Sequence, residues 1–163
     1  MATRTALVDN WTWGLSLIAL TIAIHAMGVA FMALVLLRIR ARLESRSLSL
    51  RYMIPIVIGV VGAVGLLLAI LHGMEAAIWA AAYLWLGALD APKEAILYSV
   101  DSMTTRGASG LMLEQHWRMM GALEAAAGML SFGMSTAFIF AVMQVYWPML
   151  LQDVHDPPSP MMK

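Results

Sequence analysis

The chain has 163 residues, of which 61% are hydrophobic and only 12% are charged, a composition typical of a membrane protein rather than a soluble one. Ten basic residues balance ten acidic residues, so the charge gives no reason to expect a nucleic-acid partner. The absence of cysteine excludes disulfides, thiolate metal sites and cysteine nucleophiles.

The first predicted transmembrane span is the apolar run from residue 11 to residue 37. At about 1.5 Å per residue, this run exceeds the ~30 Å hydrocarbon core of a bilayer. The loop that follows, residues 38–51, contains five arginines and a single acid, Glu44. Short arginine-rich loops stay in the cytoplasm, so we expect the N-terminus outside and this loop inside. The same arginines are also suited to binding anionic lipid head groups.

The second predicted span runs from residue 52 to about residue 86. His72 and Glu75 lie one turn apart on one face of this helix. Three aromatic residues near its end fit an aromatic belt at the outer membrane surface: Trp79, Tyr83 and Trp85.

A polar stretch, PKEAILYSVDSMTTRGASG, separates the second and third apolar runs at residues 92–110. Pro92 suits the first position of a helix, so we expect a short helix from residue 92 to about residue 103. The next seven residues combine glycines, hydroxyls and small side chains: Thr104, Thr105, Arg106, Gly107, Ala108, Ser109 and Gly110. A half-helix leading into irregular backbone between two spans is the layout of a re-entrant pore loop. Such backbone is tolerated at membrane depth only where protein buries it or where it lines an aqueous path.

The third predicted span runs from residue 117 to residue 146, where the Trp147-Pro148 pair should stop the helix. This span is dense in small residues, which allow close helix packing and also leave room for a water-filled path. The candidate pore-lining or hinge positions in it are Gly128, Ser131, Gly133 and Thr136. For any one of the glycines, ordinary helix packing is the simpler interpretation.

These elements predict an all-α membrane protein with three transmembrane helices and a re-entrant pore helix and filter loop between the second and third. Residues 1–51 would form an outer helix with its cytoplasmic arginine loop, and residues 52–147 the pore domain. Residues 148–163 contain four prolines and are expected to form a disordered cytoplasmic tail.

From about residue 72 to residue 143 the chain resembles the small bacterial ion-channel proteins of the potassium-channel pore-loop superfamily, often described as two-pore-domain-like. The resemblance rests on three stretches in order: HGMEAAIWAAAYLWLGAL, EAILYSVDSMTTRG and HWRMMGALEAAAGMLSFGMSTAFIFAVM. It implies a homotetramer in the bacterial inner membrane, with one filter strand per subunit and the last span lining the inner pore. Monovalent cations such as potassium would occupy the pore, and no cofactor is expected.

The filter segment departs from this family. A potassium filter of the TVGYG type presents rings of backbone carbonyls to the ion. Alignment on the threonine pair places Thr105 at the threonine position, and Gly107 keeps its place. Arg106 then stands at the valine position, Ala108 replaces the aromatic residue, and Ser109 replaces the second glycine. We therefore expect weak or altered selectivity.

Arg106 is a cation at membrane depth, which is costly without compensation. Asp101 lies five residues earlier on the predicted short helix, so we expect an Asp101–Arg106 salt bridge within or between subunits. Glu75 and Glu124 are the other possible partners. A bridged Arg106 would brace the filter in place of the lost aromatic residue. If Arg106 instead faces the axis, four copies would repel cations.

Four further ionisable residues lie within the spans: His25, His72, Glu75 and Glu124. The last three are expected to meet behind the filter, and His25 lies nearer mid-membrane. Imidazole and carboxylate groups can form a metal or proton site, but hydrogen-bonded contacts between helices are the simpler interpretation. No metal site is predicted.

Three functions remain in competition. The first is a cation-conducting pore with altered selectivity, and the second is a non-conducting structural or regulatory protein on a channel scaffold. The third is a membrane metalloprotein that uses the His and Glu residues. Nothing resembles a nucleophile elbow, a phosphate loop or a nucleotide fingerprint, so we do not expect an enzyme. The expected partners are membrane lipid and further copies of the chain, and an additional membrane subunit stays possible.

Overall fold

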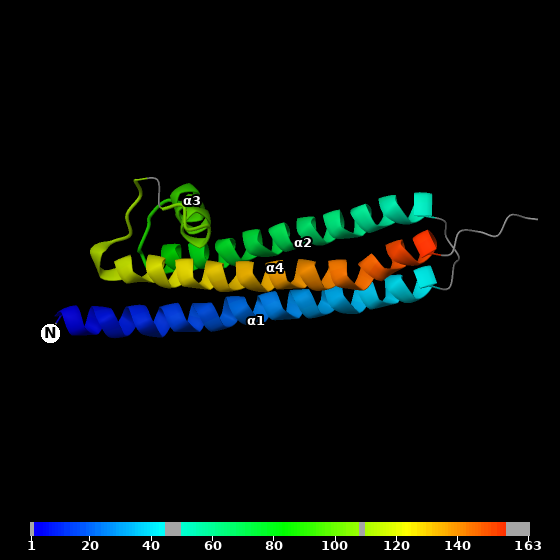
Figure 1. Cartoon of the computed structure of the whole chain (residues 1–163). Helices are drawn as coiled ribbons and strands as arrows, with labels where there is room; N and C mark the ends of the chain where they lie inside the picture. Colours follow the sequence, from blue (N-terminus) through cyan, green and yellow to red (C-terminus); the bar gives the residue numbers. More distant parts are fainter. Residues whose placement is uncertain (1, 45–49, 108–109, 156–163) are drawn as a thin grey trace, which may run out of the picture. The chain divides into compact units, whose positions relative to one another are not determined.

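The computed structural model describes residues 2–44, 50–107 and 110–155, and this part of the chain is helical apart from short connections. Its elements, in chain order, are α1 (Ala2–Glu44), α2 (Leu50–Trp85), α3 (Pro92–Met103), the 3-10 helix η1 (Gln115–Trp117) and α4 (Arg118–His155) (Figure 1). No strand occurs among the described residues. The short helix predicted between the second and third apolar runs is confirmed as α3.

Three of these helices are long and apolar enough to cross a membrane, over the segments Leu7–Leu43, Arg51–Trp85 and Gln115–Pro148. Large apolar side chains such as Phe31, Leu66 and Phe132 are more than 60% exposed. Helices that are apolar all round belong in lipid or in a large protein interior. The described part of the chain is therefore helical and contains three helices that could span a membrane, as the composition predicts.

Two predicted boundaries are wrong. α1 continues through the first arginines of the predicted 38–51 loop as far as Glu44, because arginine is a good helix former. α4 passes through the predicted stop at Pro148 and ends at His155. A proline removes one N–H and crowds one carbonyl, which a long apolar helix accommodates without ending. Residues 148–155 are thus helical rather than disordered, and residues 156–163 lie outside the described part.

The chain separates into two compact units, Met1–Gly28 with Ala69–Met134 and Val29–Leu68 with Ser135–Lys163. The first unit contains the start of α1, the end of α2, all of α3 and the start of α4. Figure 1 shows α3 beside the end of α2 and the start of α4. The core of this unit includes Trp79, Tyr83, Ala95, Met120 and Ala127, each fully buried.

The predicted aromatic belt is only partly present. Trp79 and Tyr83 are fully buried in the core of the first unit, where Tyr83 contacts Tyr98 of α3 and Glu124 of α4. Trp85 is 73% exposed and packs edge-on against Trp13 of α1, with 5.1 Å between ring centroids. Trp85 alone of the three therefore keeps a position suited to the interface.

The second unit contains the end of α1, the start of α2 and the end of α4. The hydroxyl of Tyr146 donates a hydrogen bond to the carbonyl oxygen of Leu36 at 3.3 Å. The other buried apolar residues of this unit are Met32, Met53, Val64, Leu68 and Val142. The predicted filter residues 104–110 belong to the first unit.

Candidate functional site

The short helix α3 buries polar side chains against the protein, together with the apolar Ala95, Tyr98 and Met103, and exposes several apolar side chains on its outward side. Ser99, Asp101 and Ser102 are buried, whereas Ile96 and Leu97 are 52% and 43% exposed. A water-soluble amphipathic helix exposes polar rather than apolar side chains on its outward side. The outward side of α3 is therefore suited to lipid or to another protein surface.

Glu124 of α4 joins α2, α3 and α4 through buried hydrogen bonds. Tyr83 of α2 donates to its Oε2 at 2.6 Å, and Ser99 of α3 makes a short hydrogen bond with its Oε1. Ser99 Oγ also lies 2.7 Å from the carbonyl oxygen of Ala76, although one hydroxyl proton cannot serve two acceptors at once. Tyr98 packs edge-on against Tyr83. The pKa of the Tyr98 phenol is raised, mainly because the phenol is buried and secondly because the Glu124 carboxylate is near. Glu124 thus supports α3 from behind.

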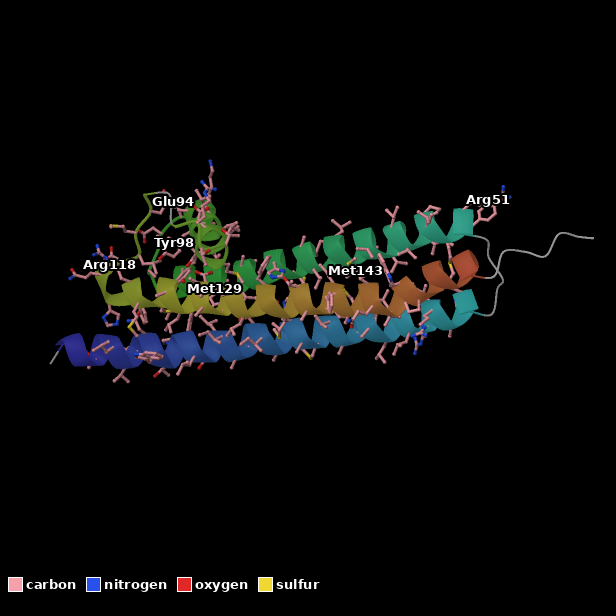
Figure 2. The ribbon with its side chains drawn as sticks, in the orientation of Figure 1. Arg51, Glu94, Tyr98, Arg118, Met129 and Met143 are labelled. Atoms are coloured by element: carbon pink, nitrogen blue, oxygen red, sulfur yellow. The ribbon has the colours of Figure 1, made fainter. Side chains whose placement is uncertain are left out.

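The C-terminal half of α3 lies directly against α4. Ser102 Oγ donates to the carbonyl oxygen of Gly121 at 2.8 Å. A Cβ on Gly121 would collide with the hydroxyl of Tyr98, and a Cβ on Gly128 would collide with the main chain of Met103. Tyr98 is labelled on α3 in Figure 2. Close approach therefore requires glycine at both positions. Gly128 therefore makes the close packing contact that the simpler interpretation predicts.

α3 ends in a Schellman-type turn that occupies the first predicted filter positions. Thr104 is the C-cap, the N–H of Thr105 donates to the carbonyl of Ser102 at 2.9 Å, and the N–H of Arg106 donates to that of Asp101 at 3.0 Å. Thr105 has φ +56°, a left-handed conformation that glycine usually supplies and that strains a β-branched residue. Gly107 follows with φ +87°. The helical conformation therefore ends at this turn.

The predicted Asp101–Arg106 salt bridge is confirmed, and it forms within one chain. Arg106 Nη1 lies 3.2 Å from Asp101 Oδ1. The Asp101 side chain is 1% exposed and the Arg106 side chain 69% exposed, so a surface guanidinium covers a buried carboxylate. The alternative partners Glu75 and Glu124 make other contacts. The predicted filter residues Ala108 and Ser109 lie outside the described part, and Gly110 has φ +85°.

A cavity of about 520 Å³ opens at the C-terminal end of α3, between α2 and α4. Its wall is mostly apolar and includes Ala76 and Phe132. Its polar lining comes from His72 on α2 and from the threonine pair, Thr104 and Thr105. The first filter residues and one of the predicted support residues therefore share one cavity.

The predicted pore-lining residues of α4 are not gathered on one surface of the chain. Ser131 is fully buried, and its hydroxyl has no hydrogen-bond partner among the described residues. Gly133 and Thr136 are exposed, and a Cβ on Gly133 would meet nothing within 4 Å. Gly133 is thus free of the close packing that Gly128 makes.

The His and Glu residues form a different group from the one predicted. His25 Nδ1 of α1 lies 2.7 Å from Glu75 Oε1 of α2, and both side chains are fully buried. The rings of His25 and His72 meet edge-on with 5.1 Å between centroids. His25, His72 and Glu75 could hold a metal ion, whereas Glu124 bonds to Tyr83 and Ser99 instead. The expectation that Glu124 joins His72 and Glu75 is wrong, because α1 supplies the third group.

Asn10 has a structural role that the sequence did not reveal. This residue is 2% exposed, and its Oδ1 accepts a hydrogen bond from the N–H of Met120 in the first turn of α4 at 3.1 Å. Its Nδ2 donates to the carbonyl of His116, whose ring lies 3.2 Å from Asp9. Asn10 therefore caps the start of α4 from α1, which is distant in sequence but in contact in space. Local capping patterns, which compare neighbouring residues, contain no signal for such a contact.

Comparison of the chain with models of protein families, with curated proteins and with solved structures gives no match.

Proposed function

We propose that the chain is one subunit of a pore-loop ion channel, with α3 as its re-entrant pore helix and residues 104–110 as its filter. The supporting observation is the depth at which α3 ends. Met103 packs against Gly128, about ten residues into α4, which corresponds to roughly 15 Å along the helix axis. The hydrocarbon core is ~30 Å thick, so α3 would end near its middle in a membrane whose outer boundary lies at the start of α4.

The outward apolar side of α3 supports the same proposal. Ile96, Leu97 and Val100 are each more than 40% exposed in the single chain. Neighbouring subunits of a ring would cover these side chains. A homotetramer, as the family resemblance implies, would bring four filter segments around one axis. In this assembly the N-terminus would be outside a bacterial inner membrane and the C-terminus inside.

The salt bridge indicates how a cation path can tolerate Arg106. Asp101 compensates the guanidinium within each subunit and directs it back toward α3. The local charge of the pair is then near zero, so cations would not be excluded. Because Thr105 already adopts a capping turn, regular carbonyl rings of the potassium type are not expected. We therefore propose monovalent cation conduction with weak selectivity.

The same turn favours a second candidate, a non-conducting structural or regulatory membrane protein on a channel scaffold. The N–H groups of Thr105 and Arg106 are used to cap α3, and the Arg106 side chain is held by Asp101. These contacts stabilise the end of α3 whether or not ions pass, so a non-conducting protein could retain the same segment. Ion flux separates the two candidates.

The test is flux from liposomes containing the purified protein, with potassium, sodium and chloride gradients applied separately. Cation flux would support the channel, and chloride flux would place Arg106 on the axis. The triple variant Arg106→Val, Ala108→Tyr, Ser109→Gly restores the potassium-type residues. Potassium flux from this variant alone would favour the non-conducting scaffold. If neither protein conducts and cross-linking detects only single chains, the channel proposal is wrong.

A further inference from the structure

Two helices of the first unit bring two imidazoles and one carboxylate together away from the filter. His72 and Glu75 lie one turn apart on α2, and His25 faces them from α1. One candidate ligand atom from each residue lies within 4.8 Å of the other two. The three ligand atoms would need to move only slightly closer together to bind one ion, because bonds from zinc to nitrogen and oxygen are ~2.0–2.2 Å long.

Glu75 is incompletely satisfied by the protein. Its side chain is fully buried, and His25 contacts its Oε1. Its Oε2 is also buried and has no hydrogen-bond partner among the described residues. Burying a carboxylate oxygen without a partner is costly, and buried charges are normally paired or bound to metal. A cation beside Glu75 would remove this cost.

We propose that His25, His72 and Glu75 bind one divalent transition-metal ion, with zinc as the ion to test. Two histidines and one carboxylate are a known ligand set for zinc, which keeps a fourth position for water. Calcium would need six to eight oxygen ligands, and magnesium an octahedral, mostly oxygen shell, neither of which this site offers. A divalent ion with two neutral imidazoles and one carboxylate gives the site a net charge of about +1. A water molecule as the fourth ligand would help to stabilise this charge.

The cavity beside α3 supplies a route to the site. His72 is part of its wall, and His72 itself is only partly buried. An ion can therefore reach His72 from this cavity, whereas His25 and Glu75 are fully buried and do not line it. Metal bound there would link α1 to α2, beside the end of α3. This inference does not depend on ion conduction, and its test uses no flux measurement.

The experiment measures zinc bound to the full chain in detergent after removal of the affinity tag. All variants carry His116→Ala, because the exposed pair of His116 and Asp9 is a second place where zinc can bind. Elemental analysis should give one zinc per chain. Cobalt, added as a spectroscopic substitute, should give visible bands of a low-coordinate site. Glu75→Gln and His72→Ala should each weaken zinc binding at least tenfold, since loss even of a group that only orients a ligand costs about 10- to 100-fold.

The conservative variant His25→Gln tests the third ligand, and helix content by circular dichroism shows whether each variant is folded. Loss of zinc from a folded variant supports the site. No zinc on the folded His116→Ala protein would overturn the proposal. Unchanged zinc affinity in both Glu75→Gln and His72→Ala would overturn it as well. If His25→Gln does not fold, these two variants on α2 still decide the outcome.

Discussion

Replacement of Glu124 by alanine should detach α3 from the two spans that hold it. The carboxylate is fully buried and contacts Tyr83 and Ser99, which are fully buried as well. Hydrogen bonds between helices in membranes contribute ~0.6 kcal/mol on average and up to ~1.7 kcal/mol. Loss of two such bonds accounts for about 1–3 kcal/mol. The space left by a buried side chain adds about 2 kcal/mol or more, so we expect a loss of at least ~3 kcal/mol.

Two milder variants grade this effect. Tyr83→Phe removes one donor and leaves the carboxylate in contact with Ser99, so it should cost about 1 kcal/mol. Glu124→Gln keeps the volume, and its amide offers an oxygen to Tyr83 and an N–H to Ser99. Its cost should also stay near 1 kcal/mol. Glu124→Ala should therefore cost about three times as much free energy as Tyr83→Phe or Glu124→Gln.

The assay exploits the absence of cysteine in the chain. A single cysteine in place of Ala95, which is fully buried on the inner side of α3, should react slowly with a thiol reagent. Its labelling rate reports how often α3 opens, and the ratio of rates gives the free energy of that opening. In the Glu124→Ala background we expect labelling to accelerate more than a hundredfold, which corresponds to about 3 kcal/mol.

Glu114→Ala is the matched control, because Glu114 is an exposed glutamate in the loop after α3. This variant should leave the labelling rate unchanged. Equal labelling rates in Glu124→Ala and Glu114→Ala would refute the role of Glu124 as the anchor of α3. Equal effects of Glu124→Ala and Tyr83→Phe would show that only the tyrosine contact matters.

Three further variants and one control variant probe the end of α3 and its contact with α4, each by equilibrium unfolding in detergent. Arg106→Gln should lower the free energy of unfolding by about 1 kcal/mol at low salt and by less at 1 M salt, because the guanidinium beside Asp101 is largely exposed and therefore screened. Equal losses at both salt concentrations would contradict a stabilising role of the ion pair. Thr105→Gly should stabilise the protein by about 0.5–1 kcal/mol, since it relieves left-handed strain that exceeds the entropy cost of glycine; destabilisation would mean that the turn is absent. Gly128→Ala should cost about 1–3 kcal/mol through its clash with the end of α3, whereas Gly133→Ala should be neutral or stabilising by up to ~1 kcal/mol. Similar effects of the two alanines would contradict the close contact.

The features that the sequence predicts well are those that depend on local composition. Long apolar runs identify the spans because a bilayer requires about 20 consecutive apolar residues. The short helix from Pro92 is predicted from its first residue and from the glycine-rich segment after it. The Asp101–Arg106 bridge is also local, since five residues along a helix and its cap keep the two side chains within reach of each other. The continuation of α4 through Pro148 is the exception, because the effect of a proline depends on the helix around it.

The site residues depend instead on how distant helices align. His25 and Asn10 reach their partners only because α1 lies at one register against α2 and α4, and a shift by one turn, about 5.4 Å, would replace every partner. Helices that are apolar on all sides carry no polar face to predict this register. Gly128 likewise differs from Gly133 only through the main chain of Met103 that lies against it. Local sequence thus determines which segments enter the membrane, and the packing between them determines which side chains meet.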